Sequence, residues 1–159
     1  MATGTLGLPL PARASKGPAT PAEIKRIKTG YDGLEYLLAN FDKETTKCKP
    51  ECERTPDTVR TYMGLRSMDH PLYQIEKVLS KGQDNLEDPD DLEVYITAVE
   101  NYSSAISESN AMAYTSSFGE YNPGGGKDEV VKYLLLAKQQ VVLARDNLQI
   151  ILKCLGEKV

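Results

Sequence analysis

Apolar side chains recur along the chain at helical spacing, and capping patterns divide them into segments. The first segment begins at Thr20, because Thr20, Pro21 and Glu23 form a capping-box pattern with proline at the first helical position. Spacings of three and four then predict a helix to about Asn40, with these apolar positions: Ile24, Ile27, Tyr31, Leu34 and Leu38. Gly30 and Gly33 oppose this helix, and close packing by a neighbouring helix would explain them.

Residues 41–54 are polar and include a proline, so they predict a long loop. A second helix is expected from Thr55, which precedes Pro56, to Lys81, with Gly82 as its end. The stretch 64–71 interrupts its apolar pattern, and Asp69-His70-Pro71 looks like a restart. We therefore expect a kinked or broken helix here.

The third helix starts at Asp88-Pro89 and reaches about Phe118, with small side chains crowded in its second half. Glycines at 119–126 end it, and a fourth helix extends from about Lys127 to Leu155. No alternating run typical of strands competes with these helices. The pattern predicts an all-α fold, an up-and-down four-helix bundle over residues 20–159, after an extended flexible arm over 1–19.

Composition is that of one globular domain, since 159 residues include 40% hydrophobic and 26% charged residues. The net charge of -4 excludes a basic footprint for nucleic acid, and no apolar run predicts a membrane span. There is one histidine, His70, which argues against His-rich metal sites and most acid–base catalysis. We expect His70 to be a surface residue that titrates normally.

Charge is uneven along the chain. Residues 1–30 carry one acid and these five basic side chains: Arg13, Lys16, Lys25, Arg26 and Lys28. Residues 84–108 carry eight acids and no lysine or arginine. This asymmetry is either an ordinary solvated surface or a device that orients the protein on a partner.

The three cysteines divide into a local pair and a distant one. Cys48 and Cys52 share one loop, whereas Cys154 ends the fourth helix, about 40 Å away in the predicted bundle. A Cys48–Cys52 disulfide is favoured over free thiols, and a metal site is the least favoured because ligands are too few. Cys154 is expected to be an unpaired thiol that packs as a small hydrophobe.

Other sequence signals for chemistry are weak, and we expect no catalytic, cofactor or metal site. Gly124-Gly125-Gly126-Lys127 lacks phosphate-loop spacing, and the acids at 84–93 lack the calcium-loop pattern. The tyrosines at 31, 95 and 102 fall on apolar stripes and are expected in the core. Tyr114, Phe118 and Tyr121 flank the glycine-rich connection, where they either anchor an interface or cover the bundle end.

Three stretches resemble a known family: 59–64 (VRTYMG), 71–77 (PLYQIEK) and 111–118 (AMAYTSSF). They are similar to lumenal proteins of algal plastids, the PsbQ-like extrinsic proteins of photosystem II, over roughly residues 20–156. The nearest match is the additional extrinsic subunit of diatoms, because plant members do not lead one to expect the Cys48–Cys52 spacing.

The resemblance implies a protein of the chloroplast thylakoid lumen, peripheral to the membrane and without enzymatic activity. Such a protein docks on the photosystem II core and other extrinsic subunits, shields the manganese–calcium cluster and helps retain Ca²⁺ and Cl⁻. The lumen is oxidising enough for the disulfide, and we expect a monomer when free. The alternative is a generic four-helix adaptor or a secreted ligand-like binding protein.

Overall fold

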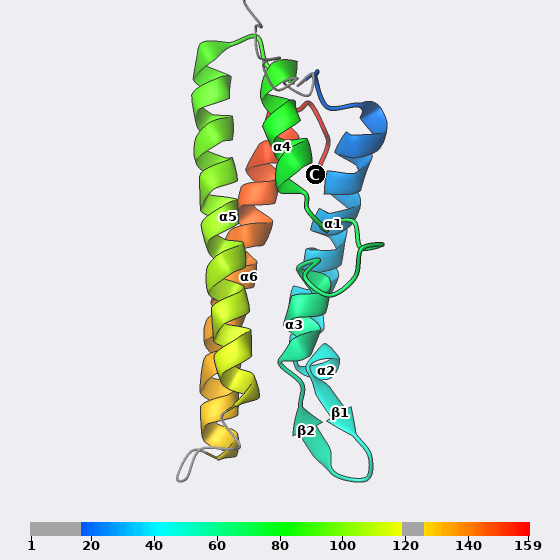
Figure 1. Cartoon of the computed structure of the whole chain (residues 1–159), viewed down its shortest axis with the longest axis vertical. Coiled ribbons are helices and arrows are strands. Elements are labelled where there is room, and N and C mark those ends of the chain that lie inside the picture. Colours follow the sequence, from blue (N-terminus) through cyan, green and yellow to red (C-terminus); the bar gives the residue numbers. More distant parts are fainter. Residues whose placement is uncertain (1–16, 119–125) are drawn as a thin grey trace, which may run out of the picture.

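The computed structural model of the protein describes residues 17–118 and 126–159. The described chain is mostly helical, so the predicted all-α class is right in its main part (Figure 1). Three long helices are α1 (Pro21–Ala39), α5 (Pro89–Ser117) and α6 (Lys127–Cys154). The shorter elements are α2 (Phe41–Glu44), β1 (Thr46–Cys48), β2 (Cys52–Arg54), α3 (Asp57–Tyr62), α4 (Glu76–Gly82) and the 3-10 helix η1 (Gln83–Asn85).

The predicted starts of α1 and α5 are confirmed. The Glu23 N–H donates to Thr20 Oγ1 at 3.2 Å, and the Thr20 N–H donates to Glu23 Oε2 at 2.9 Å. Lys81 Nζ lies 2.8 Å from Glu23, which ties the end of α4 to the start of α1 and lowers the pKa of that carboxyl. At α5, the Asp90 N–H donates to the Asp88 side chain at 2.8 Å.

Small side chains, which are crowded in the second half of α5, let α5 and α6 approach closely. Buried along α5 and α6 are Ala98, Ala105, Ser109, Ala113 and Ser116, with Ala137 and Ala144. At the end near the α5–α6 connection, Ser116 Oγ donates to the Val130 carbonyl at 2.7 Å. Larger core side chains complete the packing, and the tyrosines at 31, 95 and 102 are buried as expected.

The second helical segment is broken, and the predicted restart at Asp69-His70-Pro71 is wrong. α3 ends at Tyr62, and no α-helix resumes before Glu76. Gly64 has a φ of 77°, and added Cβ atoms there would meet the Leu72 and Tyr73 backbone, so the chain turns sharply at this point. The helix also begins later than the expected Thr55, because Pro56 is the N-cap residue of α3 and makes no side-chain cap bond.

The predicted long loop at 41–54 is wrong in part, because it contains α2 and an antiparallel hairpin. The hairpin pairs Thr46 with Arg54 and Cys48 with Cys52. Its base is extended by the Thr55 N–H, which donates to the Thr45 carbonyl at 2.6 Å. Strands of three residues are too short for an alternating pattern to stand out in a sequence.

Glu44 holds α2 between α1 and α3. Tyr36 and Tyr62 each donate a phenolic hydrogen bond to one of its carboxylate oxygens, both at 3.0 Å, and their rings stack with centroids 6.3 Å apart. Burial, followed by the bond to Glu44, raises the pKa of Tyr62 to about 12.

The packed body begins no later than Ala19. This residue is buried, and its N–H donates to Asn85 Oδ1 at 2.8 Å. Residues 1–16 of the predicted arm lie outside the described residues. Within the described ranges, no helix combines the length and the apolar character that crossing a membrane requires.

The two glycines of α1 have different surroundings. A Cβ at Gly30 would lie 2.2 Å from Leu72 Cδ2. Leu72 belongs to residues 63–75, the irregular stretch between α3 and α4, rather than to a neighbouring helix. A Cβ at Gly33 would meet nothing within 4 Å, so close packing does not explain this glycine.

Gly30→Ala should therefore lower the free energy of unfolding by about 1–3 kcal/mol, because Leu72 is buried and cannot move aside freely. Gly33→Ala is the matched control and should raise it by up to about 1 kcal/mol through helix propensity alone. Urea unfolding followed by circular dichroism measures both, and equal effects of the two substitutions would contradict the packing described here.

Candidate docking site at the hairpin end

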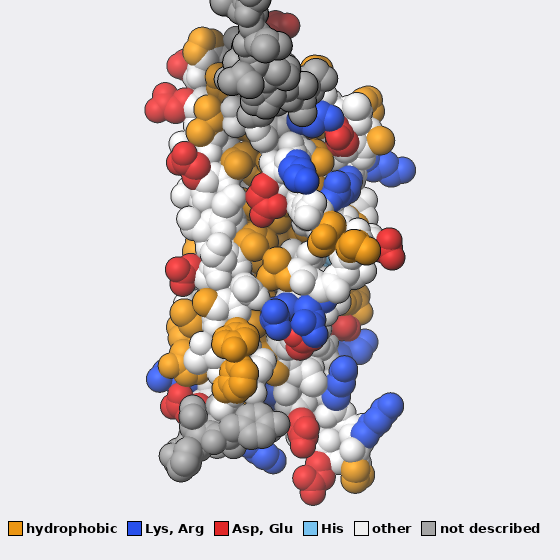
Figure 2. Space-filling model, viewed as in Figure 1, with side chains coloured by type: hydrophobic (Ala, Val, Ile, Leu, Met, Phe, Trp, Pro, Cys, Tyr) orange, Lys and Arg blue, Asp and Glu red, His pale blue; other side chains and the backbone are white. Residues whose placement is uncertain are grey.

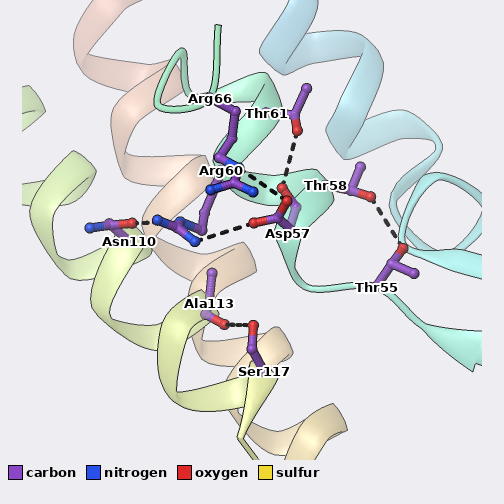
Figure 3. A network of polar contacts seen from close by, with 9 residues as sticks. All are labelled: Thr55, Asp57, Thr58, Arg60, Thr61, Arg66, Asn110, Ala113 and Ser117. Atoms are coloured by element: carbon purple, nitrogen blue, oxygen red, sulfur yellow. Dashed lines mark hydrogen bonds and ion pairs between the residues drawn. The ribbon is translucent and has the colours of Figure 1, made fainter.

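A polar network joins α3 to α5 near the hairpin (Figure 3). Asp57, in the first turn of α3, accepts from Arg60 Nη1 on one oxygen and pairs with Arg66 Nε on the other, both at 3.2 Å. Arg60 Nε donates to Asn110 Oδ1 at 2.9 Å, which carries the network across to α5. Side chains from two helices thus hold the Arg60 guanidinium, whereas the Arg66 guanidinium pairs with Asp57 of α3.

An exposed aromatic pair extends this network along α5. Asn110, Tyr114 and Phe118 follow at spacings of four, so they share one face of the helix. The rings of Tyr114 and Phe118 meet edge to face with centroids 4.8 Å apart, yet the residues stay 55% and 47% exposed. Figure 2 shows hydrophobic and basic side chains gathered beside each other low on this face. We call Arg60, Arg66, Asn110, Tyr114 and Phe118 the aromatic–arginine patch.

Beside the patch, a polar pocket of about 300 Å³ separates the hairpin from the ends of α5 and α6. Lys47 and Arg54 line it together with Glu53 and Asp57, so cationic and anionic groups balance. Arg54 donates to Asp42 at 3.2 Å and to Thr45 Oγ1 at 3.0 Å, while its buried Nε has no partner among the described residues. Such a pocket suits a polar side chain of a partner.

The disulfide prediction is confirmed. Cys48 and Cys52 are bonded with an S–S distance of 1.93 Å, and both are exposed in the hairpin. Cys154 is free and partly buried against the core at the far end of α6, where burial raises the pKa of its thiol. Among residues 17–118 and 126–159, no group of three or more His, Cys, Asp or Glu residues could hold a metal ion.

The predicted contact residues lie at opposite ends of the molecule. Lys25, Arg26 and Lys28 are near the start of α1, whereas Tyr114 and Phe118 are near the end of α5 (Figure 1). Arg13, Lys16 and Tyr121 lie outside the described residues. The basic residues and the aromatic residues therefore form two separate candidate contacts.

The three basic residues of α1 differ in what they contact. Arg26 is directed inward, with Nε donating to the Pro71 carbonyl at 2.6 Å and Nη2 donating to the Tyr73 carbonyl. Lys28 pairs with Asp32 and lies 5.4 Å from the Tyr31 ring centroid. Lys25 is exposed and makes no ion pair among the described residues. Arg26 thus organises the irregular stretch in addition to any role at the surface.

Arg26→Ala should lower the free energy of unfolding by about 1.5–3 kcal/mol, because two carbonyls lose a charged donor. Lys25→Ala, one residue away, removes the same charge and should change stability by less than about 0.5 kcal/mol. Thermal and urea unfolding of both variants measure this difference. If the two variants were equally stable, the contacts of Arg26 would not hold the stretch.

His70 is not the ordinary surface histidine that the sequence predicts. Its Nδ1 accepts a hydrogen bond from the Leu72 N–H at 3.1 Å, and the residue is partly buried. Burial lowers the pKa of the imidazole, because the cation is disfavoured there. Protonation of Nδ1 would also break the bond to Leu72.

The unfolded chain therefore binds more protons at His70 than the folded one, and stability should fall as the pH drops from about 7.5 to 5.5. His70→Asn retains an acceptor for Leu72 without the titration, so its stability should change less over this range. The carboxyl of Glu23, whose pKa is lowered from 4.5, titrates below the range. Urea midpoints at several pH values test this, and parallel profiles would refute it.

Sequence reasoning missed Asp57, Arg60, Arg66 and Asn110 as parts of the site. The spacing of Asn110, Tyr114 and Phe118 is a signal that could have revealed the shared face. The pairing of Arg60 with a side chain fifty residues away has no local signal.

Comparison with known proteins adds no family assignment: no family model matches the chain, and no curated protein and no solved structure matches it.

Proposed function

We propose that this chain is a non-enzymatic docking protein, an extrinsic lumenal subunit of photosystem II of the PsbQ-like class. In this role it binds the core and other extrinsic subunits, stabilises the manganese–calcium cluster and helps retain Ca²⁺ and Cl⁻. The proposal places it in the chloroplast thylakoid lumen, peripheral to the membrane and monomeric when free. The sequence stretches at 59–64, 71–77 and 111–118 support this choice of class.

The proposal includes the bundle architecture. We propose that α1, the α3–α4 segment, α5 and α6 form an up-and-down four-helix bundle whose second helix is interrupted over 63–75. Contacts of α5 with α6, α1 with α6 and α3 with α5 support it. Met68 lies within this interruption, and its side chain is 78% exposed.

The observation that carries the docking role is the aromatic–arginine patch. Aromatic and arginine side chains dominate binding energy at protein interfaces, especially where they are held rigidly before binding. Here Arg60 is held by Asp57 and Asn110, Arg66 pairs with Asp57, and the two aromatic rings meet edge to face. The exposed rings keep apolar area in water that a partner could cover.

The oxidised hairpin agrees with a lumenal location. Exposed disulfides persist in oxidising compartments and are rare where thiols are kept reduced. This feature also fits a secreted ligand-like protein, so the choice between the two depends on the partner.

Reconstitution tests the function and the patch together. Photosystem II particles from a diatom, stripped of extrinsic proteins, should bind the added chain in the presence of the other subunits and recover oxygen evolution. The double variant Tyr114→Ala/Phe118→Ala should bind about tenfold or more weakly, because two central aromatic contacts are lost. Binding should also weaken as ionic strength rises.

Leu135→Ala is the matched control, since Leu135 on α6 is 46% exposed and lies outside the patch. It should restore oxygen evolution like the unmodified chain. Failure of the unmodified chain to bind would overturn the photosystem II role and leave the adaptor alternative. Equal binding by the double variant and the control would overturn the patch as the docking site.

A further inference from the structure

On a different face, α5 and α6 enclose an apolar groove of about 410 Å³. Val94 and Ile150 form its apolar rims, and they are 51% and 39% exposed. On α6, Leu143 continues the same stripe at helical spacing and is 48% exposed. The lining residues of α5 span Asp90 to Asn101, a length of about 17 Å, or roughly three helical turns.

The described chain leaves this groove open. α1 packs on α6, while α3 and α4 pack on α5, and the groove lies between α5 and α6 outside these contacts. Three large aliphatic side chains remain in water on adjoining helix surfaces. Contiguous exposed apolar surface with a polar rim is typical of a protein interaction site.

The charged residues that line the groove are both acidic. Asp90 and Glu93 line it, and α5 contains five acids and no lysine or arginine. Among the described residues none of these acids takes part in an ion pair. On α6, Arg145 forms ion pairs with Glu35 and Asp146. Lys153, three residues after Ile150, is another basic residue of this helix. The upper edge of α5 in Figure 2 accordingly carries red side chains.

Asn147 adds a polar side chain to the lining of the groove. Its amide nitrogen donates to the Leu143 carbonyl at 2.8 Å, which fixes the side chain, and the residue is 9% exposed. Its amide oxygen accepts no hydrogen bond from the described residues, so it can accept one from a donor of a partner.

We propose that this groove binds a basic amphipathic helix of a partner protein. Apolar side chains at i, i+3 or i+4 and i+7 of that helix fill the space between Val94 and Ile150. Its lysine or arginine side chains face Asp90 and Glu93, and this complementarity selects a basic helix over an acidic one. The proposal does not depend on the photosystem II role, because it concerns another face and uses none of the aromatic–arginine patch.

A synthetic helical peptide of about 18 residues, with leucine at those positions and lysine elsewhere, is the probe. Fluorescence anisotropy with the full chain should give a saturable, salt-sensitive Kd, and a version with glutamate in place of lysine should not bind. Ile150→Ser and Glu93→Lys should each weaken binding by about fivefold or more. Hydrogen exchange should show protection on α5 and α6 around the groove.

Glu100→Lys is the control for charge, because it reverses an exposed acid on the same helix that does not line the groove. Weakening as large as that of Glu93→Lys would assign binding to the general field of α5 and overturn the proposal. Failure of the lysine peptide to bind would overturn it as well. Dimerisation in sedimentation experiments, abolished by Ile150→Ser, would assign the groove to a second copy and would also overturn it.

Discussion

The close approach of α5 and α6 is the constraint on which the rest of this structure depends. Alanine and serine at the contact, including Ala98, Ala105 and Ala144, bury little apolar area each but bring the two backbones together. A pair of long helices joined in this way is a rigid base on which α1, α3 and α4 pack. The buried positions of α5 pack in the core, and its exposed positions are available for other roles. The aromatic–arginine patch and the acidic groove both use them.

The broken second segment is shaped by how the stretch between α3 and α4 packs on α1. A continuous helix over 57–82 is not formed, and Leu72 packs so closely against Gly30 that no room is left for a Cβ there. Instead, the chain turns at Gly64 and is held by Arg26 at the carbonyls of Pro71 and Tyr73. These bonds replace the hydrogen bonds that a regular helix would supply to its own backbone. A side chain of α1 therefore supports a stretch of chain some forty-five residues away in sequence.

Local signals in the sequence were enough for the three long helices α1, α5 and α6, and non-local contacts account for what was missed. Thr20-Pro21-Ala22-Glu23 and Asp88-Pro89 specify helix starts through atoms within three residues, so they could be identified directly. The hairpin depends on the pairing of Cys48 with Cys52 and on a bond between Thr45 and Thr55, which an alternating pattern in strands of three residues cannot reveal. Tyr114 and Phe118 could be proposed as contact residues because they flank a glycine-rich connection in the sequence, whereas Arg60 and Asn110 meet only after folding.

The two candidate surfaces differ in the interactions with which each can bind a partner. At the hairpin end, arginine charges are already neutralised in part by Asp57, so the patch relies on aromatic area and directional hydrogen bonds. At the groove, the carboxylates have no cationic partners among the described residues, so long-range attraction acts before apolar contact does. Both surfaces involve the same helix, and α5 is held by α6 along its length. The two candidate surfaces are therefore held in a fixed arrangement relative to each other.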